Sequence, residues 1–269
     1  MNLPCTEIAY AKINLALHVR RRRDDGYHDL ETLFAFVDCG DGLTATSAPE
    51  FALSQTGRFG TLAGPVANNL VTRAARAANG GTLPPIWFDL EKRLPVAAGL
   101  GGGSADAAAT LRAMGAGDRH DLAATLGADV PACLDSVPVI GLGTGTVLQP
   151  VANDVAGLAC LLVNPGVPLA TGPVFKAWDG DDRGAMPGGS ARSIAMAGRN
   201  DLEAPARLLC PAIGEVLNAL DGSGALLVRM SGSGASCFAL FEDHAAAKAA
   251  THGLQSSRPE WWTMLGRLR

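Results

Sequence analysis

A glycine cluster between two contrasting segments most constrains what this chain can fold into. The cluster reads Gly99-Leu100-Gly101-Gly102-Gly103-Ser104. Ile86 to Leu90 before it has the composition of a strand, and the alanine-rich stretch from Ala105 to Met114 favours a helix that begins directly after it. Glycines let backbone N–H groups approach an anion, and a helix adds the positive end of its dipole. The order strand, glycine loop, helix therefore predicts a polyphosphate site, with a ligand-free turn as the alternative.

The spacing of the cluster excludes the two common nucleotide-binding templates. No lysine follows in the G-x-x-x-x-G-K-[ST] arrangement, and the spacing is not G-x-G-x-x-G. The hydroxyl of Ser104 is expected where the first helical N–H groups meet the phosphates. Ser104 is therefore predicted to cap the helix, to ligate Mg²⁺, or to do both.

A strand that begins at Ile8 carries a second group of candidate residues. Its apolar residues alternate with polar ones, which predicts a half-buried strand with Lys12 and Asn14 on the polar face, directed into one cleft. The turn residues Asp24-Asp25-Gly26 and a second extended segment, Leu30 to Val37, predict a hairpin. Lys12 alone would more often be a surface lysine.

Residues on either side of this turn have two interpretations each. Tyr27 and His28 offer a ring for stacking and a directional hydrogen-bond partner, or they simply pack. The basic run from Arg20 to Arg23 is predicted to be a solvated loop, with a role near a phosphate as the alternative.

Two further segments are candidates for the site. Asp129 is a lone carboxylate among small apolar residues in Leu126-Gly127-Ala128-Asp129-Val130-Pro131, so it is a catalytic candidate or a helix cap. Met230-Ser231-Gly232-Ser233-Gly234-Ala235 is a second small-residue loop, able to approach the phosphates or the first domain, or only a tight turn.

The length of 269 residues favours two modest domains, which we place at residues 1–152, with the phosphate-binding loop, and 153–269. Asp179 to Arg199 is poor in large apolar residues and is predicted to be an exposed, mobile loop. The mixture of predicted elements indicates an α+β fold. These elements are helices at Leu70 to Ala78, Pro205 to Leu220 and His244 to Leu254, and strands at Leu158 to Val163, Ala225 to Met230 and Ser236 to Phe241.

Composition narrows the class of partner. The formal charge of -4 argues against a positively charged surface for binding nucleic acid. No apolar run approaches the roughly 18 residues of a membrane span. The six cysteines form no C-x-x-C pair, which argues against a zinc site. The first residues do not read as a secretory signal, so we expect reduced thiols, a cytoplasmic location and a small-molecule ligand.

Taken together, these segments resemble the GHMP kinases, and within them the 4-diphosphocytidyl-2-C-methyl-D-erythritol kinases. The glycine loop indicates only the wider family, whereas Ala11-Lys12-Ile13-Asn14-Leu15 with Gly26-Tyr27-His28 is much narrower. The matches run in the expected order through nearly the whole chain. They continue in Asn69-Leu70, Lys92-Arg93-Leu94-Pro95, Gly127-Ala128-Asp129-Val130-Pro131, Asn164-Pro165-Gly166-Val167, Asn200-Asp201-Leu202 and Ser231-Gly232-Ser233-Gly234.

The resemblance implies a two-domain α+β fold, with an N-terminal domain like domain 2 of ribosomal protein S5 and a ferredoxin-like C-terminal domain. It also implies transfer of the ATP γ-phosphoryl group to the 2-hydroxyl of 4-diphosphocytidyl-2-C-methyl-D-erythritol, in the non-mevalonate route to isoprenoid precursors. Mg²⁺ would be bound mainly through ATP.

The same resemblance assigns roles to residues. Asp129 would accept the hydroxyl proton, and Lys12 would hold Asp129 in its ionised form and offset charge on the transferring group. In the substrate site, Tyr27 and Phe175 would sandwich the cytosine, His28 and Asn14 would hydrogen-bond the substrate, and Thr171 would lie near its polar groups. The nucleotide side would comprise Asn69, Lys92, Pro95, Val96, Ala97, Ala98, Gly99, Leu100, Gly101, Gly102, Gly103, Ser104 and Ala105.

The chain departs from the family pattern at two positions. Ala105 stands where a second serine is usual, and Thr146 stands where many relatives carry a glutamate. Rival interpretations are a GHMP kinase for mevalonate, homoserine or a sugar, which should lack the aromatic cytosine site, and a non-catalytic binding protein, which would not need both Lys12 and Asp129.

Overall fold

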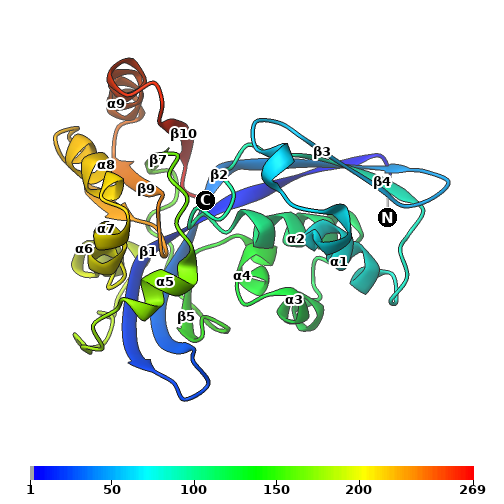
Figure 1. The fold of residues 1–269 in the computed structure, drawn as a ribbon, viewed down its shortest axis with the longest axis horizontal. Coiled ribbons are helices and arrows are strands. Elements are labelled where there is room, and N and C mark those ends of the chain that lie inside the picture. The colour runs from blue at the N-terminus through cyan, green and yellow to red at the C-terminus, as the bar shows by residue number, and fades with distance from the viewer. Residues whose placement is uncertain (1–2) are drawn as a thin grey trace. The chain divides into compact units, whose positions relative to one another are not determined.

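A computed structural model describes residues 3–269, and Figure 1 shows its elements. The residues group into two compact units that are interleaved along the chain. Unit 1 comprises residues 3–12, Cys39–Val96 and Gly101–Ser136, and unit 2 comprises Ile13–Asp38, Ala97–Leu100 and Val137–Arg269. The domain division near residue 152 stays a prediction.

A long β-hairpin opens the chain, drawn in blue in Figure 1. β1 (Cys5–Arg22) pairs with β2 (His28–Ser47). In the turn, the N–H of Arg23 donates to the carbonyl of Tyr27 over 2.8 Å, and Gly26 has a φ of 83°. That backbone conformation favours glycine, and the predicted hairpin is confirmed.

The sequence pattern of β1 was misleading in two respects. Residues 11–19 are buried without interruption, so the central part of the strand is not half-buried as predicted. The polar Asn14 tolerates burial because its Nδ2 donates to Thr32 Oγ1 over 2.8 Å. The arginines up to Arg22 belong to the strand rather than to a solvated loop.

Unit 1 contains part of a mixed sheet and four helices. β4 (Ile86–Glu91) pairs antiparallel with the second half of β2 and parallel with β3 (Ala52–Thr56). The helices α1 (Leu70–Ala78) and α4 (Val130–Asp135) both contact α2 (Gly102–Ala113), and α3 (His120–Leu126) contacts all three. Two 3-10 turns, η1 (Gly60–Leu62) and η2 (Val66–Asn68), precede α1.

Unit 2 combines two sets of strands with five helices. β5 (Val139–Gly143) pairs antiparallel with the first half of β2 and with β6 (Val147–Pro150). A four-stranded antiparallel sheet has the order β10-β7-β9-β8. Its strands are β7 (Ala159–Asn164), β8 (Leu227–Met230), β9 (Cys237–Phe241) and β10 (Trp262–Arg267), and the helices are α5 (Thr171–Lys176), α6 (Ala191–Ala197), α7 (Glu203–Leu209), α8 (Ala212–Asp221) and α9 (His244–Ser257).

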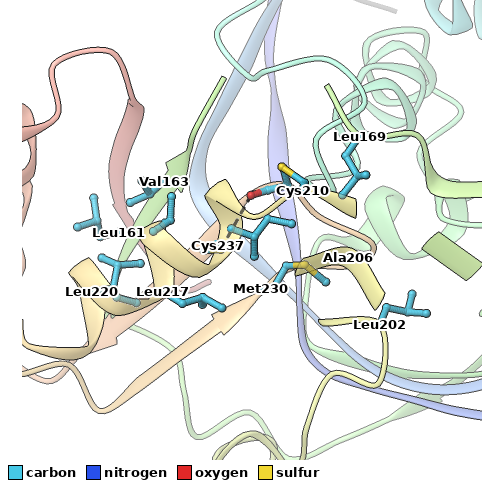
Figure 2. Packing of buried hydrophobic residues seen from close by; sticks show 14 of the residues in the cluster. Leu161, Val163, Leu169, Leu202, Ala206, Cys210, Leu217, Leu220, Met230 and Cys237 are labelled. Atoms are coloured by element: carbon cyan, nitrogen blue, oxygen red, sulfur yellow. Dashed lines mark hydrogen bonds between the residues drawn. The ribbon is translucent and has the colours of Figure 1, made fainter. Parts of the chain in front are cut away.

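The hydrophobic core of unit 2 lies between this sheet and its helices (Figure 2). Leu217 and Leu220 of α8 lie in one buried cluster with Leu161 and Val163 of β7. β7 is buried at every position, and its first five residues are accordingly apolar without alternation, while the buried Asn164 at its end donates a hydrogen bond to the Ser236 hydroxyl.

The predicted elements are confirmed with three corrections. The helix expected from Pro205 to Leu220 is two helices, because a residue before a proline avoids the α region, and Cys210 before Pro211 has φ -138° and ψ 84°. The expected mobile loop from Asp179 to Arg199 contains α6, whose N-cap Ser190 accepts from the N–H of Ser193. The third correction is the start of α2, which lies at Gly102 rather than directly after the glycine cluster. The sequence did not predict β3, β5, β6, β10, α3, α4 and α5.

Within residues 3–269, no helix combines the length and the apolar character that crossing a membrane requires.

Candidate active site

Lys12 and Asp129 form an ion pair in unit 1. Nζ of Lys12, near the start of β1's buried stretch, lies 3.2 Å from Oδ2 of Asp129. The lysine side chain is 6% exposed, whereas that of Asp129 is 32% exposed, so the carboxylate can meet a ligand from solvent. Asp129 is the N-cap residue of α4, but in the described chain its side chain makes no capping hydrogen bond. The helix-cap interpretation of this carboxylate is therefore wrong.

The second half of the glycine cluster, Gly102 to Ser104, forms the first turn of α2, whereas Gly99 to Gly101 precede the helix. The helix begins at Gly102, and its N-cap is Gly101, with a φ of 64°. Ser104 is thus the third residue of the helix, and its predicted capping role is wrong, since an N-cap must lie outside the helical turn. A glycine N-cap supplies no side-chain acceptor, which leaves the first N–H groups of α2 available to an anion.

Gly101 also brings the start of α2 close to the ion pair. A Cβ at this position would lie 3.0 Å from both Cβ and Cε of Lys12. The absence of that atom lets the lysine side chain pass beside the helix terminus. The structure therefore places Lys12, Asp129 and the α2 N-terminus together in unit 1, and phosphate binding at this place stays a prediction.

The second small-residue loop packs against the preceding part of the glycine segment, within unit 2. The hydroxyl of Ser231 donates to the carbonyl of Gly99 over 2.8 Å, and the N–H of Ser236 donates to the carbonyl of Ala98 over 3.2 Å. A Cβ at Gly99 would lie only 2.3 Å from the carbonyl oxygen of Ser231. The N–H of Asn14 donates to the Ser231 hydroxyl over 3.2 Å, so the loop is more than a simple turn.

Lys92 lies in a buried cluster with two carboxylates of unit 1. Its Nζ donates to Asp106 Oδ2 over 2.7 Å and also bonds Asp41 Oδ2. The other oxygen of Asp41 accepts from the backbone N–H groups of Arg93 and Leu94, at 2.6 and 2.8 Å. The cluster therefore joins β2, the residues after β4 and the second turn of α2.

Burial and charge shift the pKa values of this cluster in opposite ways. Burial raises the pKa of Asp106 to about 7, against the lowering effect of Lys92. Burial lowers the pKa of Lys92, but the nearby Asp106 and Asp41 charges outweigh it and raise that pKa. Oδ1 of Asp106 is buried and has no hydrogen-bond partner in the described part of the chain. Burial, together with the negative charge of Asp41, thus raises the pKa of Asp106 and favours a proton on it, although Lys92 opposes this.

Asn69, expected on the nucleotide side, has a visible structural role. Its Oδ1 accepts from the N–H of Val71 over 2.9 Å and caps α1. Its Nδ2 donates to Gln55 Oε1 over 3.2 Å. Neither contact tests nucleotide binding, which stays a prediction for Asn69 and Lys92.

An aromatic cluster in unit 2 brings together two of the three base-recognition candidates, His28 and Phe175. The His28 ring lies 4.9 Å from Phe175 and 5.7 Å from Trp178, measured between centroids, with interplanar angles of 38° and 81°. His28 is buried, and burial, followed by the charge of Arg22, lowers its pKa. Tyr27 is 66% exposed. A neutral imidazole and an exposed phenol therefore sit next to each other in sequence, in very different environments.

Thr171 begins the helix that carries Phe175, and its hydroxyl lies 3.0 Å from the Ser233 hydroxyl of the second small-residue loop. The sequence did not indicate Trp178, Asp41 or Asp106 as site neighbours. A carboxylate inside the alanine run of α2 was the one signal that could have identified Asp106.

Metal ligands are sparse. Nowhere in residues 3–269 do three or more His, Cys, Asp or Glu side chains form a group that could hold a metal ion. The Ser104 hydroxyl and the Asp129 carboxylate are oxygen donors of the kind that Mg²⁺ prefers. This small donor set fits a metal that is held mainly by nucleotide phosphates.

Family models match both halves of the chain. The model of the GHMP kinases N terminal domain matches residues 69–136, and the model described as GHMP kinases C terminal matches residues 188–259.

Individual proteins match over the whole length. The 4-diphosphocytidyl-2-C-methyl-D-erythritol kinase of Novosphingobium aromaticivorans is 58% identical, over 98% of this chain and 92% of its own. That of Erythrobacter litoralis is 51% identical, over 98% and 99%. A crystal structure of 4-(cytidine 5'-diphospho)-2C-methyl-D-erythritol kinase matches with a TM-score of 0.79 at 34% identity, covering 98% of this chain and 99% of that one. A homoserine kinase from Cytophaga hutchinsonii shares the fold, with a TM-score of 0.69 at 17% identity, over 100% and 96% of the two chains.

Proposed function

The chain belongs to the GHMP kinase family, as one of its 4-diphosphocytidyl-2-C-methyl-D-erythritol kinases, and we propose that it transfers the γ-phosphoryl group of ATP to the 2-hydroxyl of that substrate. This reaction is a step of the non-mevalonate route to isoprenoid precursors. The predicted two-domain α+β fold of the family is confirmed. The observation that carries the mechanism is the Lys12–Asp129 pair beside the start of α2.

We assign the ATP phosphates to the N-terminus of α2. The partial positive charge of a helix start and its unbonded N–H groups suit a polyphosphate. Gly102 and Gly103 in the first turn leave backbone N–H groups accessible, and Ser104 adds a hydroxyl. Mg²⁺, bound mainly through the phosphates, would supply charge neutralisation there.

Asp129 is the proposed general base. It takes the proton of the acceptor hydroxyl as that oxygen forms its bond to the γ-phosphorus, while the bond from this phosphorus to the bridging oxygen breaks and ADP leaves. Lys12 holds the carboxylate in place across 3.2 Å, and its charge offsets negative charge on the transferring group. Positioning and electrostatics then supply most of the catalysis.

The aromatic cluster of unit 2 is the proposed cytosine site. Tyr27, with its exposed ring, and Phe175 would stack on the base, and His28 would hydrogen-bond it. Asn14 and Thr171 would contact polar groups of the substrate. A small-molecule substrate and a cytoplasmic location complete the proposal, and the six free cysteines fit a reducing compartment.

The test of the base is Asp129→Asn, which keeps the size of the side chain but cannot take the proton. We expect kcat to fall by at least about 10²-fold while both substrates still bind. Asp135→Asn is the matched control, because Asp135 lies at the end of the same helix and pairs on the surface with His120. A near-normal kcat for Asp129→Asn, in protein shown to be folded by circular dichroism, would remove Asp129 as the base.

The test of the substrate is a coupled ATPase assay with several alcohols. The cytidylated methylerythritol should support turnover, whereas mevalonate, homoserine and free methylerythritol should not. Equal efficiency with any of these three would refute the substrate assignment and leave the kinase assignment standing.

A further inference from the structure

Arg22, at the end of β1, differs from the other arginines of its run in what its guanidinium contacts. Nε of Arg22 donates to Nε2 of His28 over 3.4 Å. Its Nη2 faces the carbonyl oxygens of Lys176 and Trp178, at 3.4 and 3.5 Å. Lys176 is the last residue of α5, so the guanidinium meets the negative end of the helix that carries Phe175.

The neighbouring arginines are instead neutralised by carboxylates. In the part of the chain that the structure describes, Arg22 forms no ion pair, whereas its three neighbours do. The pairs are Arg20 with Glu31 and Asp182, Arg21 with Asp29, and Arg23 with Asp25 and Asp29. The charge of Arg22 is therefore directed at one imidazole and two carbonyl groups.

This contact determines where the proton of His28 lies. A guanidinium donates hydrogen bonds and accepts none, so the ring nitrogen that faces it must present a lone pair. A neutral imidazole carries one proton, which must then be on Nδ1. Arg22 is also the charged group that opposes a second proton on the ring, because its charge adds to burial in lowering the pKa of His28.

We propose that Arg22 is a specificity-determining positioning residue, which fixes His28 as the neutral tautomer with its proton on Nδ1. Nδ1 has no hydrogen-bond partner within residues 3–269, so this N–H is available as a donor. Cytosine presents acceptors at N3 and O2, whereas uracil carries a proton on N3. A fixed donor on Nδ1 therefore favours cytosine. With uracil, the N–H of Nδ1 would face the N–H of uracil N3, and two opposed donors without an acceptor are costly in a buried site.

The tautomer is tested on the free protein by NMR of ¹⁵N-labelled histidine. In the wild type, Nδ1 of His28 should carry the proton and Nε2 should show the shift of an unprotonated nitrogen. In Arg22→Met the proton should redistribute toward Nε2. Arg21→Met is the matched control, because it removes the same charge from the adjacent residue, which pairs with Asp29, and it should leave the His28 spectrum unchanged.

The base preference, which rests on the proposed function, is tested by kinetics with the cytidine substrate and its uridine analogue. Arg22→Met should lower the ratio of the two kcat/KM values by about tenfold or more, mainly through KM for the cytidine substrate. Arg21→Met should keep the wild-type ratio.

The outcomes separate the two proposals. A proton on Nε2 of wild-type His28 overturns the role of Arg22, and that result needs only wild-type protein, so it decides even if Arg22→Met fails to fold. An unchanged spectrum and base ratio in folded Arg22→Met also overturn it. Absence of turnover with either base in the wild type would instead refute the proposed function, and the tautomer result would stand.

Discussion

Replacing Lys92 with Met tests whether the Asp41–Lys92–Asp106 cluster stabilises unit 1. Methionine keeps an unbranched apolar side chain of similar length but removes the ammonium group. Two carboxylates then remain at positions where their side chains are 0% and 4% exposed. Buried charges without a partner are strongly unfavourable, so the variant should be less stable.

The structure sets the size of this loss. Removing one partner of a buried ion pair costs about 3–5 kcal/mol. Asp41 keeps two backbone donors, the N–H groups of Arg93 and Leu94, which still compensate its charge. Asp106 has a second oxygen with no donor, and it can escape the penalty only by taking up a proton. We therefore expect a loss near the lower figure, about 3 kcal/mol, at pH 8.

The loss should depend on pH in a defined direction. Burial raises the pKa of Asp106 to about 7 in the folded protein, above the value of about 3.9 in an unfolded chain. Between these values the folded state binds the proton more tightly, so this group's contribution to stability falls as pH rises from about 4 to about 7 and is level above. Without Lys92 the folded pKa moves higher still. Lys92→Met should therefore lose less stability at pH 6 than at pH 8.

Urea unfolding at pH 6 and pH 8 measures both effects. The free energy of unfolding is extrapolated from the midpoint and slope for the wild type, for Lys92→Met and for Lys248→Met, an exposed lysine of α9 that serves as the control. A loss below about 1 kcal/mol for Lys92→Met at pH 8, in the range of surface substitutions, would refute the reasoning, as would an equal loss at both pH values.

Three further outcomes are expected. Gly99→Ala should destabilise the protein by at least about 1 kcal/mol in urea unfolding, because a Cβ there would lie 2.3 Å from the Ser231 carbonyl oxygen and the φ is 78°. Gly101→Ala should lower kcat by about tenfold or more in the coupled assay, because the added Cβ would press on Lys12 and displace it from its partner carboxylate. Phe175→Ala should raise KM for the cytidine substrate by roughly two- to tenfold, the equivalent of losing one aromatic stacking contact, with little change in KM for ATP.

Local patterns were sufficient for much of the fold. The turn residues before Gly26 predicted the hairpin, and the helical spacing from Leu70 to Ala78 predicted α1 to the residue. The strand, glycine segment and helix occur in the predicted order. These features depend on residues close in sequence, where turn chemistry and hydrophobic period are direct signals.

Features that depend on distant partners were beyond such reasoning. Asp41 and Lys92 are separated by 51 positions, so the sequence around either residue gives no sign that their side chains are in contact. Burial on both faces of β1 was also hidden, because the alternation that suggested a solvated face consists of polar residues with buried partners, such as Asn14 with Thr32. The break between α7 and α8 is different: Pro211 was visible in the sequence, and its effect on the preceding residue was underestimated.

The glycine cluster shows how one motif can hold residues with different reasons for lacking a side chain. At Gly99 and Gly101 a Cβ would meet the protein itself, namely the Ser231 carbonyl in one case and Lys12 in the other. At Gly102 the nearest atom to such a Cβ, Nζ of Lys92, would be 3.4 Å away, an ordinary contact distance, and the residue has no positive φ. The protein's own packing therefore does not require glycine at position 102. A phosphate that approaches the first turn of α2 would explain the glycine. We therefore expect Gly102→Ala to weaken ATP binding in calorimetry while the free energy of unfolding stays nearly unchanged, and an unchanged ATP affinity would contradict this reasoning.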